Sequence, residues 1–195
     1  MKKTFLAAMA LIIAFAFSAC EKTETPETPT PEPTKEEMLQ TAKGWIMTAA
    51  TSDPAYIMAD GSGNAFTDLY KNFFESYELD DIYFYKEGGA LEVDPGQIGE
   101  YGYQKKETLG VWKLFSNNTK LVTKVPGFYD YDEVNNVWIM DEVNLIDITS
   151  TTLKYSFKWN VSDTKSKSIQ GKRAPRATKG DDPEQYTWTF TFTAK

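Results

Sequence analysis

The chain has 195 residues, no histidine and one cysteine, Cys20, and its formal net charge is −7. Without an imidazole, no Ser-His-Asp or Cys-His nucleophilic site can form, and one thiol can neither close an intrachain disulfide nor join a zinc site with paired Cys or His ligands. Hydrophobic residues make up 41% and charged residues 25%, which is typical of a folded domain. We therefore expect a protein that is not an enzyme, with no catalytic residues, no metal and no cofactor.

The first twenty residues have the pattern of a bacterial export signal. Lys2 and Lys3 precede an apolar run over residues 5–17, which is short for a membrane span but suits a signal peptide. The following Ser-Ala-Cys resembles the lipobox of bacterial lipoproteins. This resemblance implies a signal peptide over residues 1–19, cleavage before Cys20 and a diacylglycerol thioether on its sulfur. An ordinary signal peptide with a chance cysteine at its end is the alternative.

Charge and lipid together predict where the mature chain resides. Removal of residues 1–19 leaves 19 basic and 28 acidic residues and a net charge of −9, which opposes binding to nucleic acid and to anionic membrane surfaces. The expected partner is the membrane, through the lipid on Cys20, because two or more acyl chains hold firmly at roughly 0.8 kcal/mol per buried methylene. We expect an outer-membrane anchor, with the periplasmic and cell-surface sides both open.

A proline-rich segment links the expected anchor to the expected domain. Residues 20–34 carry four prolines among Thr and Glu and offer no apolar side chains to bury, so we expect a disordered, extended tether. The domain is expected over residues 35–195. It begins with a capping box, in which Thr34 is the N-cap and Glu37 is the third helical residue, so a short helix is predicted up to about residue 43.

The next elements are read from the spacing of apolar residues. Gly44 is expected to end the first helix, and residues 45–51 are expected to form the first strand. Residues 52–64 contain Pro54 and a Gly-rich stretch and are predicted to be loop. Apolar residues between Phe66 and Tyr77 recur at helical spacing, which predicts an amphipathic helix of about three turns that covers the sheet or caps one end of it.

After residue 80 the apolar period changes to two, which is the period of strands. Three hairpins are predicted, with Gly-Gly or Asn-Asn at their turns. They pair residues 82–86 with 90–94, 108–115 with 120–125, and 128–132 with 137–141. Further strands are expected at 143–149, 153–159 and 186–193.

The last two predicted strands alternate between large apolar and polar side chains, as on a sheet with one face in water. Residues 161–184 between them contain six Lys and Arg residues and almost no apolar ones. A connection of this length is expected to be a mobile basic loop. It is either a solvated insertion or a site for an acidic partner.

Eight or nine short strands joined by hairpins predict an all-β barrel or sandwich. The pattern resembles the lipocalin-like lipoproteins of Bacteroidota. The resemblance lies in the Gly44-Trp45 pair after a short helix, in the strand that runs from residue 80 into Gly88-Gly89, in residues 110–114 before an Asn-Asn turn, and in residues 146–149. It implies an up-and-down barrel of about eight antiparallel strands that encloses a ligand cavity or a packed interior.

Aromatic residues are the candidates for ligand binding, since an eight-stranded barrel is wide enough to hold one small ligand. The alternative is that they only fill the core. Tyr83 and Tyr85 form a further pair, which points outward and can stack on a glycan if Ile82 and Phe84 point inward. The candidates for ligand binding are Trp45, Trp112, Trp138, Tyr155, Trp159 and Trp188.

The function predicted from these features is non-catalytic binding of a small apolar molecule, lipid or glycan by a membrane-anchored envelope lipoprotein. A protein–protein interaction module of a cell-envelope assembly is the alternative. A glycoside hydrolase that uses only carboxylates is a remote alternative, because such enzymes need no more than two facing acids. The acidic groups for it are Asp80-Asp81, Asp130-Asp132-Glu133 and Asp141-Glu142.

Overall fold

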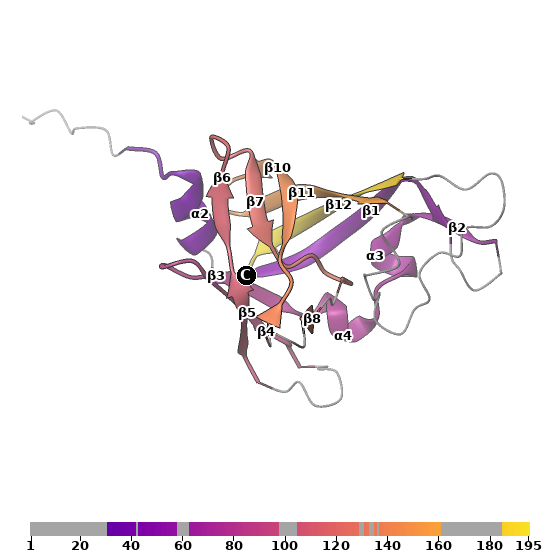
Figure 1. The fold of residues 1–195 in the computed structure, drawn as a ribbon, viewed down its shortest axis with the longest axis horizontal. Helices are drawn as coiled ribbons and strands as arrows, with labels where there is room; N and C mark the ends of the chain where they lie inside the picture. Colours follow the sequence, from indigo (N-terminus) through magenta and orange to yellow (C-terminus); the bar gives the residue numbers. More distant parts are fainter. Residues whose placement is uncertain are drawn as a thin grey trace, which may run out of the picture. The chain divides into compact units, whose positions relative to one another are not determined.

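The strands pair in an order that leads almost once round a barrel (Figure 1). The path runs β5-β4-β3-β1-β12-β11-β10-β7-β6, and each pairing along it is antiparallel. The strands are β1 Trp45–Ile57, β3 Ile82–Tyr85, β4 Ala90–Asp94, β5 Glu107–Val111, β6 Lys113–Phe115, β7 Lys120–Thr123, β10 Asp141–Ile148, β11 Thr152–Asn160 and β12 Gln185–Ala194.

The structure is a computed structural model that describes residues 31–41, 43–57, 63–97, 105–128, 131–132, 135, 137–160 and 185–195. The predicted signal peptide, Cys20, the tether up to residue 30 and the basic loop at 161–184 lie outside the described residues. The barrel belongs to a compact unit that spans Pro33–Lys195. In the described part of the chain, no helix has the length and apolar character needed to cross a bilayer.

The two ends of the path are joined through one residue, Trp112. β5 pairs with β4 and β6 pairs with β7, while Trp112 is the only residue between β5 and β6. The backbone N–H of Trp112 donates to the Gly89 carbonyl at 2.7 Å, and its indole Nε1 donates to the Lys86 carbonyl at 3.0 Å. β5, Trp112 and β6 therefore form one bent strand, which pairs with β4 in its first half and with β7 in its second half and so closes the barrel. The predicted lipocalin-like, up-and-down barrel of about eight antiparallel strands is confirmed.

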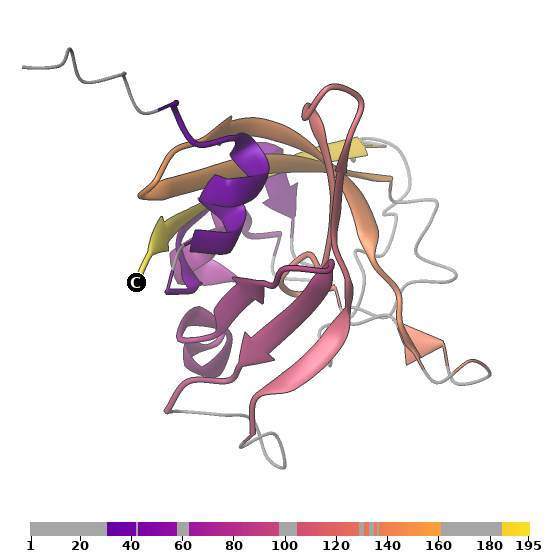
Figure 2. The same ribbon diagram turned by 90° about the vertical axis from the view of Figure 1, so that its left-hand side faces the viewer.

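The helix α2, Lys35–Thr41, lies at one end of the barrel, and Figure 2 shows it in front of the strands. The predicted capping box is present, because the Thr34 N–H donates to Glu37 Oε2 at 2.6 Å and the Glu37 N–H donates to Thr34 Oγ1 at 3.2 Å. Trp45, the first residue of β1, donates its indole N–H to the Leu39 carbonyl at 3.0 Å. This bond and the burial of Leu39 attach α2 to the barrel.

The segment between β1 and β3 differs from its prediction. β1 continues through residues 52–57, which were expected to be loop, because its outer half pairs with the strand β2, Ala65–Asp68. The predicted helical insertion is divided into α3, Leu69–Asn72, and α4, Ser76–Leu79. Asp68 accepts the Lys71 N–H and starts α3, while Glu75 and Glu78 form a capping box that starts α4. Each cap interrupts what the apolar spacing alone predicts as one helix.

The hairpin at Gly88-Gly89 forms as predicted, and the turn at Asn117-Asn118 is also present, since all four residues adopt the positive φ that such turns require. The second hairpin is shorter than predicted, because only residues 113–115 pair with β7, while β5 pairs with β4. The third hairpin is shorter than expected. It consists of β8, Tyr131–Asp132, and β9, Val137–Trp138, which form a separate two-stranded sheet.

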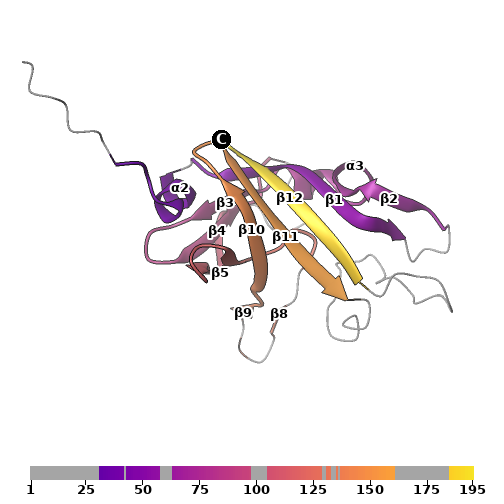
Figure 3. The ribbon, with the colours of Figure 1, turned by 90° about the horizontal axis from the view of Figure 1, so that it is seen from above.

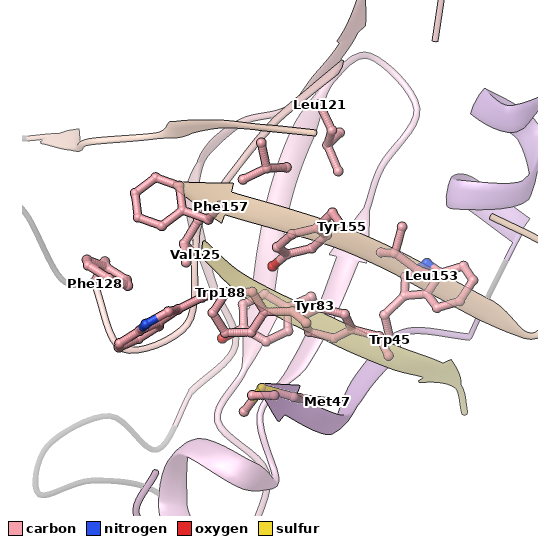
Figure 4. Close-up of a cluster of buried hydrophobic side chains, with 14 of the residues drawn as sticks. Trp45, Met47, Tyr83, Leu121, Val125, Phe128, Leu153, Tyr155, Phe157 and Trp188 are labelled. Carbon is pink, nitrogen blue, oxygen red and sulfur yellow. The ribbon is translucent and has the colours of Figure 1, made fainter. Parts of the chain in front are cut away.

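The alternation predicted for the last two strands is confirmed. Figure 3 shows β10, β11, β12 and β1 side by side, and every large apolar residue of β11 faces one of β12 across the ladder. All of these side chains are buried in the core. Figure 4 shows four of them, Leu153, Tyr155, Phe157 and Trp188, among their neighbours. The facing pairs are Leu153 with Phe192, Tyr155 with Phe190, Phe157 with Trp188, and Trp159 with Tyr186.

Candidate ligand-binding site at the long-loop end

The two ends of the barrel differ in the length of their connections. Short turns at residues 86–89, 116–119 and 149–151 lie at the end that α2 covers. The longer connections, residues 58–81, 95–106, 124–140 and 161–184, join the strands at the opposite end, which we call the long-loop end. Ligand sites of β-barrels are commonly found at the mouth, so this end is the place to search for one.

A group of buried aromatic rings fills the long-loop end. Trp159 on β11 stacks on Tyr186 on β12, with ring centroids 5.8 Å apart and an interplanar angle of 26°. Phe73, which follows α3, lies 5.1 Å from Trp188, so the insertion after β1 covers this end. The group, here called the mouth cluster, consists of Tyr56, Phe73, Phe128, Trp159, Tyr186 and Trp188.

Two polar atoms of the mouth cluster are buried without a hydrogen bond. The indole Nε1 atoms of Trp159 and Trp188 have no acceptor among the described residues. By contrast, the indole N–H groups of Trp45 and Trp112 both donate to backbone carbonyls. A buried donor without an acceptor costs about 1–3 kcal/mol, and such groups in a folded protein need a reason, such as a water or a ligand.

The phenol of Tyr56 adds a further donor to the mouth cluster. Burial raises the pKa of Tyr56 far above its usual value, and the neighbouring Tyr186 phenol raises it further. Tyr56 is therefore a neutral phenol at any physiological pH. The mouth cluster thus combines apolar ring surface with N–H and O–H donors, which suits a ligand that has an apolar body and an oxygen acceptor.

A second polar group lies within the barrel. Tyr85 on β3 and Thr123 on β7 share a hydrogen bond of 2.9 Å between their hydroxyls. Burial raises the pKa of Tyr155 well above its usual value, with smaller contributions from Tyr85 and from the Asp141 carboxylate. Because Tyr83 and Tyr85 are both buried in the core, the hypothesis of an outward pair that stacks on a glycan is wrong.

The six residues predicted to bind a ligand are spread along the barrel. Trp159 and Trp188 belong to the mouth cluster, Tyr155 contacts Phe190 and Phe192 in the core, and Trp45 lies against α2. The other two are Trp112 at the bent strand and Trp138 on β9, a half-buried ring whose centroid is 5.3 Å from Lys124 Nζ.

Four residues of the mouth cluster were not among the candidates. Tyr186 could have been included, because it precedes Trp188 on the same face of one strand. Tyr56 lay in a predicted loop, and Phe73 and Phe128 come from segments whose position depends on distant contacts.

Two surface pockets lined by described residues lie outside the barrel. One, of about 340 Å³, extends along β1, β2 and α3. The other, of about 270 Å³, is lined by Ile46, Asp80, Gly96, Gln97 and Lys195. Neither pocket is lined by any of the six predicted residues.

Among the described acidic groups, Asp80 and Glu142 make structural contacts. Asp141 and Glu142 are neighbours on β10 and point to opposite faces, so they cannot flank one bond, and Glu142 pairs with Lys120 at 3.0 Å. Asp80 accepts the Gln97 N–H at 2.8 Å, while Asp130 and Glu133 lie outside the described residues. Three or more metal-binding side chains do not gather anywhere in the described ranges.

Among the described residues, three large apolar side chains are exposed, and they bear on the protein–protein alternative. Val111, Ile139 and Ile146 are 65%, 43% and 51% exposed, and they lie on β5, after β9 and on β10. Apolar residues exposed singly are ordinary on a protein surface, and an interface is indicated by a continuous patch. The protein–protein interaction module therefore stays a prediction.

The fold and the mouth cluster define a lipocalin-like antiparallel β-barrel with one end closed by a helix and the other filled by aromatic rings. A scan against protein-family models, a search of curated proteins and a search of solved structures found no match to this chain.

Proposed function

We propose that this chain is an envelope lipoprotein, anchored through lipid on Cys20, whose barrel binds a small ligand at the long-loop end without transforming it. The observation that carries the binding function is the pair of buried indole donors, Trp159 Nε1 and Trp188 Nε1. Their rings contact each other, with centroids 5.8 Å apart, so a single bound molecule can approach both.

The mouth cluster favours one kind of ligand. Its six rings offer apolar contact. The two indole N–H groups, which have no acceptor in the described part of the chain, and the neutral Tyr56 phenol offer donors to an oxygen atom. A lipid ester or an acylated or aryl-substituted glycan unit has both an apolar body and such an oxygen. We propose a ligand of this class.

Entry of the ligand requires two rings to move. Phe73 follows the four-residue helix α3, and Phe128 belongs to the connection after β7. Helices of this length contribute little stability of their own, so their position depends on the contacts of their apolar residues. Phe73 contacts Tyr56 and Trp188. A ligand that packs against these two rings in place of Phe73 offsets the cost of moving Phe73.

The test is native mass spectrometry of the full chain purified from a bacterial envelope in detergent. We expect a small molecule to copurify with the wild type and its occupancy to fall by about tenfold in the double variant Trp159→Phe/Trp188→Phe, which lacks both donors. Trp112→Phe is the matched control, since it also removes an indole, but one whose N–H already has an acceptor. Near-ultraviolet circular dichroism checks that each variant is folded. A wild type that carries no molecule, or equal occupancy in the double variant, would overturn the proposal.

A further inference from the structure

The larger surface pocket lies where β1 changes its neighbour. β1 pairs with β3 through Trp45 and Ile46 and with β2 from Thr51 onward. Between these positions, β1 has no register partner in either of the two strands, and on its other side a bulge near Ala49 interrupts the pairing with β12. The pocket of about 340 Å³ lies against this part of β1.

Small side chains leave the space open. Ala49 and Ala50 occupy the part of β1 that lines the pocket, with the hydroxyl-bearing Thr48 and Thr51 on either side. Thr48 and Thr51 line the pocket and are exposed, so the pocket opens on the outer face of β1, while the neighbouring Ala50 is buried in the core. It is separate from the mouth cluster, with which it shares no residue.

The opposite wall carries one charge of each sign and one aromatic ring. Asp68 Oδ2 and Lys71 Nζ are 3.6 Å apart, and both side chains are accessible to solvent. The pair contributes an acceptor and a donor with no net charge. The half-buried Tyr70 lies between them in sequence and lines the same pocket.

This combination selects a class of ligand. The Asp68 carboxylate would repel an anion, and the Lys71 ammonium would repel a cation. A wholly apolar molecule would displace water from the threonine hydroxyl groups without replacing its hydrogen bonds, which is unfavourable. A neutral molecule with several hydroxyl groups satisfies donors and acceptors together, and the flat carbon face of a sugar ring can lie on an aromatic ring such as that of Tyr70. The volume is at the small end of the roughly 300–1,000 Å³ range of ligand pockets.

We propose that this pocket, bordered by β1, β2 and α3, binds a neutral sugar unit of monosaccharide or disaccharide size. It is a second site, distinct from the ligand proposed for the mouth cluster. Asp68 accepts hydrogen bonds from the sugar hydroxyls, Lys71 donates one, and Tyr70 supports the ring.

The experiment is titration calorimetry of the full chain with glucose, galactose, mannose, N-acetylglucosamine, maltose and cellobiose. The detergent must lack a sugar headgroup, so an amine oxide detergent is used. We expect at least one of these sugars to bind with a millimolar or lower dissociation constant and Ala49→Leu, which fills the pocket, to weaken it by about tenfold or more. Thr187→Leu, at a half-buried position of β12 facing away from the core, is the matched control and should bind as the wild type does.

A second variant keeps the proposal testable if Ala49→Leu does not fold. Asp68→Asn retains a good N-cap residue for α3 but removes the carboxylate, and we expect it to weaken sugar binding about tenfold. Glu142→Gln, which removes another surface carboxylate, should have no effect. The proposal is wrong if none of the six sugars binds, or if binding is the same in Ala49→Leu and Asp68→Asn as in the wild type. Sugar binding that persists in Trp159→Phe/Trp188→Phe distinguishes this site from the mouth cluster.

Discussion

The hydroxyl groups of Tyr85 and Thr123 are 2.9 Å apart and share a hydrogen bond inside the barrel. Tyr85 is on β3 and Thr123 is on β7, and these strands are not neighbours in the sheet. The bond therefore joins opposite parts of the barrel wall across its interior. It satisfies two polar groups that burial would otherwise make costly.

Removal of both partners of this bond should cost less than the two single removals added together. Tyr85→Phe leaves the buried Thr123 hydroxyl without its partner and should lower the free energy of unfolding by about 1–3 kcal/mol. Tyr85→Phe/Thr123→Val removes both polar groups, so its cost should be less than the sum of the two single variants. Urea denaturation of the four proteins measures the coupling. Strictly additive costs would show that the bond contributes nothing.

Alkaline pH should destabilise the fold. Burial holds the pKa of Tyr155 well above its usual value, so the unfolded chain loses this proton near pH 10 while the folded chain keeps it. The stabilisation is complete below the unfolded-state pKa and is lost as the pH rises through it towards the folded-state pKa. We expect the urea midpoint to fall above about pH 10, and to fall less steeply in Tyr155→Phe. The same dependence on pH in both proteins would contradict this.

The start of α2 offers a test of the capping box. Thr34→Ala removes the hydroxyl that accepts the Glu37 N–H and should lower the free energy of unfolding by about 1 kcal/mol. Thr34→Asp keeps an N-cap acceptor and should behave as the wild type. Thermal unfolding followed by circular dichroism compares the three. An equal loss of stability in Thr34→Ala and Thr34→Asp would mean that the Thr34 side chain does not act as a helix cap.

Two glycines with positive φ differ in their surroundings. Gly44 has φ +117°, and a Cβ there would collide with Ile82 and Phe84, whereas Gly88 has φ +82° and no atom near its Cβ position. Gly88→Ala should cost only the backbone strain, while Gly44→Ala should cost about 2 kcal/mol more because side chains of β3 must shift. Chemical denaturation of the two variants measures the difference. Equal costs would show that β3 adjusts freely at this junction.

The proposed lipid anchor has a direct test. Cys20→Ala removes the only thiol of the chain, so the protein should move from the membrane fraction to the soluble fraction of a bacterial host. Cys20→Ser is a second variant that cannot form a thioether and should do the same. Membrane retention of either variant equal to that of the wild type would refute lipidation as the anchor.

Local signals were reliable where the structure depends on a few neighbouring residues. The capping box of Thr34 and Glu37 predicts α2 because both of its bonds lie within one helical turn. Gly88-Gly89 and Asn117-Asn118 predict turns because these residue types adopt positive φ at little cost. In each case the sequence carries the whole physical cause.

The segment from residue 52 to residue 79 shows where local signals fail. Pro54 favours a loop, but it lies just beyond Asp53, the last residue of β1 that pairs with β12, so its missing N–H breaks no ladder there. Phe66 fits a helical pattern, but it pairs with Tyr56 in β2. Long-range pairing outweighed the local preference in both places.

The candidate site shows the same division. Large aromatic residues on alternating strands predicted that Trp159 and Trp188 face inward, and they do. Among the described residues their indole N–H groups have no acceptor, whereas those of Trp45 and Trp112 reach the carbonyls of Leu39 and Lys86. This difference depends on which backbone carbonyls the folded chain brings beside each ring.

The sequence by itself determined an all-β chain, the positions of most of its strands and the faces that these strands bury, because a period of two and turn residues act over a few positions. The tertiary structure alone decided that the barrel closes through Trp112, which aromatic rings meet at the long-loop end and where β1 leaves a pocket on its outer side. These features follow from register and packing between residues far apart in the chain, and such contacts form only once the whole barrel excludes water from its interior.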